Sequence, residues 1–116
     1  MATHKELNIW KDGIELVTRI YEITKKFPDE EKFGLISQMR RAAVSIPSNI
    51  AEGAARKNDK EFIQFLYISF GSLTELKTQI IISKNLGFVS GDELLSEIER
   101  LIKSVLSFIK YLKGLT

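Results

Sequence analysis

The sequence predicts an all-α protein, in which a single domain over residues 1–116 folds as an antiparallel up-and-down four-helix bundle. Apolar residues recur every three or four positions along the whole chain, and no stretch shows the two-residue alternation of a half-buried strand. Only two prolines and seven glycines interrupt the 116 residues. The segments left between the helical stretches are short, and short connections favour antiparallel neighbours.

The first helix is expected over about residues 8–26. It should end before Pro28, because the proline ring disfavours helical geometry at the preceding Phe27. One side of this helix carries a row of side chains at spacings of four and three, and we expect the aromatic members Trp10 and Tyr21 to lie in the core. The row consists of Trp10, Ile14, Val17, Tyr21 and Thr24.

The second helix should begin after Asp29, whose side chain can cap it, and continue to about Ala55. Pro47 lies inside this helix and removes one backbone hydrogen bond, so we expect the helix to be interrupted or kinked near Pro47. The face that we expect to be buried consists of Ile36, Met39, Ala43, Ile46, Ile50 and Ala54.

The third helix is expected from about Asp59 to Asn85. Asn58 and Glu61 fit a capping box at its start, and Gly87 is placed to end it as a left-handed residue. The face that we expect to be buried follows alternating spacings of four and three and consists of Phe62, Leu66, Ser69, Leu73, Leu76, Ile80 and Ser83.

The fourth helix should follow a second capping box, formed by Ser90 and Glu93, and close at Gly114. Its apolar residues also recur at spacings of four and three, which predicts one buried face. That face consists of Leu94, Ile98, Leu101, Val105, Phe108 and Leu112.

The residue types exclude several classes of functional site. The chain has no cysteine, which excludes disulfides, thiolate zinc sites, iron–sulfur clusters and cysteine nucleophiles. His4 is the single histidine, which excludes catalytic triads and multi-histidine metal centres. No glycine spacing matches a nucleotide-binding loop. We therefore expect no catalytic residue, no metal site, no cofactor and no small-molecule substrate, and the protein is not expected to be an enzyme.

Export and membrane insertion are not expected either. The beginning of the sequence carries charges where a signal peptide needs an apolar stretch. The longest purely aliphatic run is Ile80, Ile81 and Ile82, which is far too short to cross a bilayer. We therefore expect a cytoplasmic protein without a membrane partner.

The charge is nearly balanced over the chain, with 17 basic and 15 acidic residues, but it is uneven along it. Between Gln38 and Lys60, five basic residues stand against two acidic ones. Several of them flank the junction of the second and third helices, where free backbone N–H groups add positive potential. The alternative is that these cations only keep the protein soluble. The candidates for nucleic-acid contact are Arg40, Arg41, Arg56, Lys57 and Lys60.

A polar stripe is expected on the second helix, opposite its apolar face. Arginine pairs with carboxylates in a fork geometry, which suits both a subunit interface and a ligand site. We interpret the stripe as a structural or subunit-interface network, with direct ligand contact or a plain solvated face as the alternatives. It consists of Arg41, Ser45, Ser48 and Glu52 at spacings of four, three and four, with Asn49 beside them.

The third helix carries more apolar side chains than one buried face requires. Ile63, Tyr67, Phe70 and Ile81 lie beside or across from the expected face, and a small monomeric bundle would leave several of them exposed. Large exposed apolar patches usually mark an interaction surface. We therefore favour self-association, and the alternative is a third helix that is fully covered at the centre of a monomer.

One long run of residues resembles a known family. Phe33, Gly34 and Leu35 precede a segment over 37–53 that reads SQMRRAAVSIPSNIAEG. Shorter matches lie near the start, at Phe27 with Pro28, and along the third helix. The chain thus resembles, over nearly its whole length, the bacterial four-helix-bundle proteins encoded in intervening sequences of 23S ribosomal RNA genes. It is also similar to the accessory variability protein of diversity-generating retroelements.

The resemblance implies a homopentameric ring of four-helix bundles. It also implies a nucleic-acid partner, with ribosomal RNA expected from the gene context, and the related accessory protein is a basic pentamer that binds nucleic acid and a reverse transcriptase. We therefore expect a non-enzymatic oligomer that contacts RNA through basic patches. The alternative is a structural or protein-binding scaffold that makes no direct contact with nucleic acid.

Overall fold

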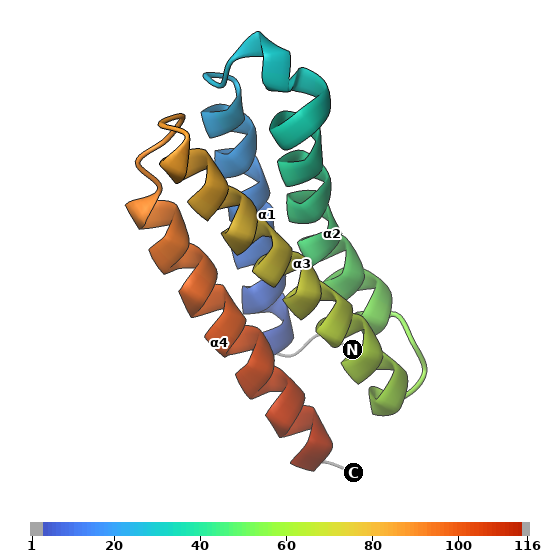
Figure 1. Cartoon of the computed structure of the whole chain (residues 1–116). Coiled ribbons are helices and arrows are strands. Elements are labelled where there is room, and N and C mark those ends of the chain that lie inside the picture. Colours follow the sequence, from blue (N-terminus) through green and yellow to red (C-terminus); the bar gives the residue numbers. More distant parts are fainter. Residues whose placement is uncertain (1–3, 115–116) are drawn as a thin grey trace.

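The computed structural model describes residues 4–114 as four α-helices packed antiparallel, which confirms the predicted fold class (Figure 1). The molecule is an elongated rod of 47 × 23 × 18 Å, and residues 4–114 contain no strand. None of the described helices has the combination of length and apolar content that a bilayer crossing requires. The elements in chain order are α1 (His4–Thr24), the short turns η1 (Asp29–Glu31) and η2 (Lys32–Ile36), α2 (Ser37–Ala54), α3 (Asp59–Asn85) and α4 (Asp92–Gly114).

The second helical segment consists of joined pieces, as predicted, but its break lies at Gly34 and not near Pro47, where the sequence places it. This residue has φ −110° and ψ −112°, where the π-helical turn η2 meets α2. Glycine lacks a Cβ atom and therefore tolerates backbone angles outside the helical region. From Ser37 onward, α2 is one element that runs through Pro47. Pro47 is buried against α1, where a Cβ atom built on Gly13 would lie 3.3 Å from the Pro47 Cβ.

The third helix forms over the predicted range, with the predicted signals at both ends. Asn58 Oδ1 accepts a 2.9 Å hydrogen bond from the Glu61 N–H, and the Asn58 amide donates to the Glu61 carboxylate at 3.1 Å. Gly87 has φ 81°, and the N–H of Phe88 donates to the Ser83 carbonyl at 2.9 Å, as in a Schellman motif. The expected face is buried throughout: Phe62, Leu66, Ser69, Leu73, Leu76, Ile80 and Ser83.

The buried side of α1 differs from the expected one. Trp10 is 38% exposed and Tyr21 is 39% exposed, so the expectation that they lie in the core is wrong. This helix carries apolar residues on two adjacent sides, and the periodicity alone does not tell which side packs against the other helices. The residues of α1 that enter the core are Ile9, Leu16 and Ile20.

The fourth helix has the expected buried face but a different start. It begins at Asp92, and Gly91, with φ 82°, precedes it, so the Ser90 capping box is not the start of this helix. Its core residues are Leu94, Ile98, Leu101, Val105, Phe108 and Leu112, together with Ile109.

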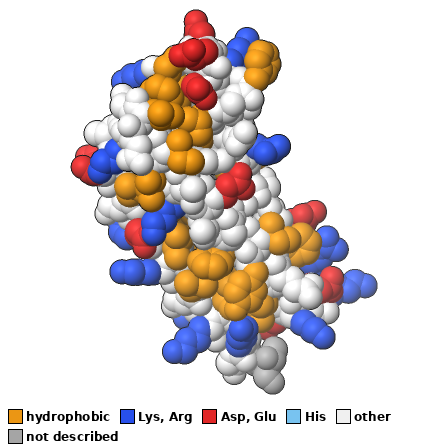
Figure 2. Space-filling model, viewed as in Figure 1, with side chains coloured by type: hydrophobic (Ala, Val, Ile, Leu, Met, Phe, Trp, Pro, Cys, Tyr) orange, Lys and Arg blue, Asp and Glu red, His pale blue; other side chains and the backbone are white. Residues whose placement is uncertain are grey.

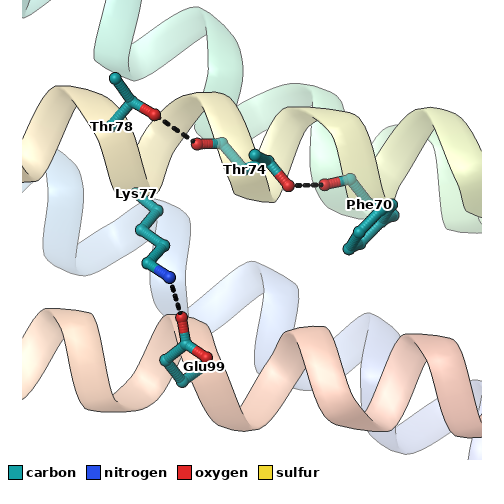
Figure 3. Close-up of polar contacts among 5 residues, drawn as sticks. All are labelled: Phe70, Thr74, Lys77, Thr78 and Glu99. Atoms are coloured by element: carbon teal, nitrogen blue, oxygen red, sulfur yellow. Dashed lines mark hydrogen bonds and ion pairs between the residues drawn. The ribbon is translucent and has the colours of Figure 1, made fainter.

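An ion pair joins the middle of α3 to α4. Lys77 of α3 pairs with Glu99 of α4 (Figure 3). On the same stretch of α3, the hydroxyls of Thr74 and Thr78 donate 3.0 Å hydrogen bonds to the carbonyls of Phe70 and Thr74. Both partners of the ion pair are about two-fifths exposed, so the pair adds little stability, and the bundle depends mainly on its apolar core.

Candidate nucleic-acid interface

The structure separates the five predicted basic residues into two groups. Arg40 and Arg41 lie near the start of α2, whereas Arg56 and Lys57 follow its end. At ~1.5 Å per residue, the two groups are about 22 Å apart along the helix axis. Lys60 lies in the first turn of α3, beside the second group. The five residues therefore do not form one continuous site.

Arg40 is engaged in contacts within the fold. Its Nε donates a 2.9 Å hydrogen bond to the hydroxyl of the buried Thr24, and its Nη2 donates to the Tyr21 carbonyl at 3.4 Å. Its guanidinium also lies 4.5 Å from the centroid of the Tyr21 ring. These contacts join the start of α2 to the end of α1, so the structure gives Arg40 a packing role.

Cations from separate helices gather at the opposite end of the bundle. Antiparallel packing brings the start of α1 and the end of α4 beside the turn that joins α2 to α3. Figure 2 shows Lys and Arg side chains around this lower end, with hydrophobic side chains between them. All of these basic side chains are exposed. We call this surface the basic end and define it by Lys5, Arg56, Lys57, Lys60, Lys110 and Lys113.

Half of these cations were not identified from the sequence. Lys5, Lys110 and Lys113 lie roughly fifty residues along the chain from the α2–α3 turn, so no local charge count includes them. The signal that could have identified them is the antiparallel topology itself, because it places both chain ends of a four-helix bundle beside the second connection.

Aromatic rings accompany the cations at the basic end. Tyr67 is 43% exposed and Tyr111 is 39% exposed, so both rings are accessible from outside. The Lys113 Nζ also donates a 3.0 Å hydrogen bond to the Tyr67 hydroxyl. Cations alternating with exposed rings are typical of surfaces that bind single-stranded nucleic acid. The cations over rings are Arg56 over Phe65 at 4.7 Å, Lys5 over Tyr111 at 3.9 Å and Lys113 over Tyr67 at 5.3 Å.

Part of the polar stripe on α2 is hydrogen-bonded to α3. Ser45 Oγ lies 2.8 Å from Ser72 Oγ of α3, and the Asn49 amide donates to the Ser45 carbonyl at 2.8 Å and to its hydroxyl at 2.9 Å. Arg41, Ser48 and Glu52 are exposed. The stripe thus contains an internal hydrogen-bond network that joins α2 to α3, beside three residues that face solvent.

An apolar groove runs along the outer side of the α1–α2 contact. Two adjoining hollows of about 240 and 280 Å³ share Trp10 and Ala51, and Ser48 of the polar stripe lines the second one. The most exposed apolar side chains of this α1–α2 groove are Leu7, Trp10, Ile14 and Val44, at 38% to 43%.

The outer side of α3 is exposed as well. Tyr67 and Ile81 are more than two-fifths exposed, and Ile68 is half exposed, whereas Ile63 and Phe70 are half-buried against the core. The alternative to self-association requires a third helix that is fully covered within one copy of the chain. These exposed side chains show that α3 is not fully covered.

A more polar groove separates α1 from α4. Glu97 of α4 is the least solvated carboxyl there, with its side chain 12% exposed and 3.0 Å from Arg19 of α1. Burial raises the pKa of Glu97, and the nearby Arg19 and Arg100 partly oppose this rise. Within residues 4–114, no three His, Asp or Glu side chains gather as a metal site would require.

Comparison with known proteins identifies the relatives of this fold. The family model described as "23S rRNA-intervening sequence protein" matches residues 5–110. The chain is also similar to a crystal structure from Bacteroides thetaiotaomicron, described as a protein of unknown function from the S23 ribosomal protein family. That match has a TM-score of 0.84 and 22% sequence identity, and it covers 91% of this chain and 98% of the other. No curated protein is significantly similar to the chain.

Proposed function

Because the chain belongs to the 23S rRNA-intervening sequence protein family, we propose that it is a non-enzymatic, self-associating bundle that binds nucleic acid at its basic end. The preferred nucleic acid is RNA, as the family description suggests. The observation that carries the proposal is the gathering of exposed cations from three helices and one turn at a single end. Lysine and arginine clusters of this kind bind phosphate backbones by releasing counterions.

Arg56, Lys57 and the start of α3 favour an anion at the α2–α3 turn, and the carboxylates of Asp59 and Glu61 in the first turn of α3 oppose it in part. The nearest carboxylate to Arg56 is that of Glu52, at 4.0 Å, and both side chains are about half exposed. A pair with this exposure is weak, so Arg56 can exchange Glu52 for a phosphate at little cost. The first N–H groups of α3 add the positive potential of a helix start next to Lys57 and Lys60.

Self-association is supported by the α1–α2 groove together with the polar stripe. Ser48 lines the groove, and Arg41 and Glu52 lie exposed on the same helix, so apolar and charged groups form one continuous surface. Surfaces that combine an apolar centre with a polar rim are typical of subunit interfaces. A closed ring, which the family resemblance suggests has five copies, would repeat the basic end around its axis and strengthen the attraction for a phosphate backbone.

The second candidate function is a scaffold that binds protein and makes no contact with nucleic acid. Arg41 favours it, because this exposed guanidinium makes no hydrogen bond or ion pair with any other residue that the structure describes. In a scaffold, Arg41 would pair with a carboxylate of a neighbouring copy or partner. Arg41→Ala would then dissociate the assembly without a separate effect on RNA.

The proposal is tested by the salt dependence of RNA binding. Fluorescence anisotropy of a labelled RNA is recorded from about 50 to about 200 mM salt, because a protein that makes several phosphate contacts loses affinity steeply over this range. We expect a linear decrease of the logarithm of the binding constant with the logarithm of the salt concentration. Absent binding, or binding that does not change with salt, would contradict the proposal and favour the scaffold.

A further inference from the structure

A hollow of about 210 Å³ lies at the basic end, between the α2–α3 turn and the last turns of α4. It is smaller than the roughly 300 Å³ at which pockets for drug-sized ligands begin, so its size suits a single flat ring. Phe108 and Tyr111 line it, and their rings stack with centroids 6.0 Å apart and 16° between the ring planes. Phe108 is only 2% exposed, whereas Tyr111 is 39% exposed, so Tyr111 is the ring of this pair on which a nucleobase can stack.

The charged groups around the hollow differ in exposure. Glu6 is 7% exposed and Asp59 is half-buried, whereas Arg56 and Lys57 are exposed. Carboxylates repel a phosphate group, but they accept hydrogen bonds from the N–H groups on the edge of a base. The hollow therefore suits a base, and the exposed cations beside it suit the phosphate that the base carries.

The accessible rings favour unpaired bases over paired ones. In a duplex the bases stack on one another, and an aromatic side chain reaches their faces only where they are unstacked. Lys5 lies over the Tyr111 ring and Lys113 over the Tyr67 ring, so a base that stacks there displaces the cation, which is then next to the adjacent phosphate. This combination of stacking and charge is what proteins use to follow a single strand without reading its sequence.

From these contacts we propose that the hollow receives one unpaired nucleobase, stacked on Tyr111, so that the basic end prefers single-stranded nucleic acid to duplex. This inference rests on the proposed function, because it needs phosphates at the basic end. It goes further in naming the form of the nucleic acid and the residue on which the base stacks.

The test compares one RNA strand with the same strand annealed to its complement, at a single salt concentration. A stacked base contributes about 1–3 kcal/mol, so wild-type protein should bind the single strand about tenfold more tightly than the duplex. Tyr111→Leu should lose about that factor for the single strand and keep its duplex affinity within about twofold. The matched control is Tyr21→Leu, which should change neither affinity, because Tyr21 is also 39% exposed under a cation but lies at the other end.

A second measurement does not depend on a variant. A strand that carries 2-aminopurine at successive positions should lose fluorescence at the position that stacks on Tyr111 in the wild-type complex. Equal affinity for strand and duplex, an unchanged Tyr111→Leu, or constant 2-aminopurine emission would each overturn the nucleobase site and leave phosphate binding in place. If neither strand nor duplex binds, the proposed function and this inference are both wrong.

Discussion

Arg40 of α2 donates a 2.9 Å hydrogen bond from its Nε to the hydroxyl of Thr24 at the end of α1. Thr24 is 1% exposed and donates in turn to the Ile20 carbonyl at 2.6 Å. The guanidinium is thus held at the end of the bundle that lies opposite the basic end. Two adjacent arginines therefore have different roles, because Arg40 joins two helices whereas Arg41 is exposed to solvent.

Replacement of Arg40 by alanine should therefore reduce stability and leave nucleic-acid binding unchanged. The variant loses a hydrogen bond from a charged donor and a cation–ring contact, and we expect the free energy of unfolding to fall by about 1–2 kcal/mol. Urea unfolding measures this change, with Lys25→Ala as the control, because Lys25 is exposed beside Thr24 and should change stability by less than about 0.5 kcal/mol. If Arg40→Ala is as stable as the wild type but binds RNA more weakly, Arg40 contacts the nucleic acid and the packing role is wrong.

Alanine substitutions at two helical glycines, Gly53 and Gly71, should change the free energy of unfolding in opposite directions. A Cβ atom on Gly53 of α2 would lie 2.7 Å from the Phe65 Cβ and 2.8 Å from the Phe62 Cδ1, so α2 and α3 would have to move apart. At Gly71 of α3, no atom lies within 4 Å of the equivalent position apart from the chain neighbours and the backbone of the same helix. We expect Gly53→Ala to lower the free energy of unfolding by about 1–3 kcal/mol. Gly71→Ala should raise it by about 0.5–1 kcal/mol, because alanine favours the helix.

Thermal or urea unfolding of both glycine variants measures these changes. If Gly53→Ala is as stable as Gly71→Ala, the result would contradict the close packing of α2 against α3 at Gly53.

Glu97 gives the protein a defined dependence of stability on pH. Burial raises the pKa of this carboxyl, so the folded protein holds the proton more tightly than the unfolded chain does. The stability that Glu97 contributes is therefore complete below the ordinary glutamate pKa of 4.5 and is lost as the pH rises through the raised pKa. Glu97→Gln removes this loss, so the variant should gain stability relative to the wild type as the pH rises from about 4 to about 7.

Urea unfolding at several pH values measures the difference between Glu97→Gln and the wild type. A constant difference would show that the charges of Arg19 and Arg100 cancel the effect of burial on this carboxyl, and a difference that falls as the pH rises would show that they outweigh it.

The α1–α2 groove makes a specific prediction about assembly. Ile14 is 43% exposed in the groove, so Ile14→Glu should leave the fold intact while it places a charge in the subunit contact. Light scattering should show the wild type as an oligomer and Ile14→Glu as a smaller species. Leu106→Glu on α4, where the side chain is 38% exposed, is the control and should keep the wild-type mass. Equal masses for wild type and Ile14→Glu would contradict the placement of the contact in this groove.

The extent to which the sequence predicts the fold differs between α3 and α1. All the expected core residues of α3 are buried, because its row of apolar and small side chains lies on one continuous face between clear capping signals. The first helix has two adjacent apolar sides, and the side with Ile9, Leu16 and Ile20 is buried although Trp10 and Tyr21 are larger. Which side is buried depends on where α2 and α4 lie, and local spacing does not contain that information.

The same limit applies to the candidate site. Arg56, Lys57 and Lys60 are close in sequence, so local charge was enough to group them. Lys5 and Lys113 join them only through the antiparallel packing of the chain ends, and the engagement of Arg40 depends on Thr24, 16 residues away. Contacts between distant segments thus decide which further cations belong to the basic end and that Arg40 has a packing role.

Nucleic-acid binding at the basic end is tested most directly by reversing two adjacent charges at each end of the bundle and measuring RNA affinity by anisotropy at one salt concentration. Arg56→Glu with Lys57→Glu changes the basic end, and Lys25→Glu with Lys26→Glu makes the same change of net charge at exposed residues of the opposite end. We predict that the first double variant loses at least about tenfold in affinity and that the second stays within about threefold of the wild type. Equal losses in the two double variants would contradict a binding site at the basic end.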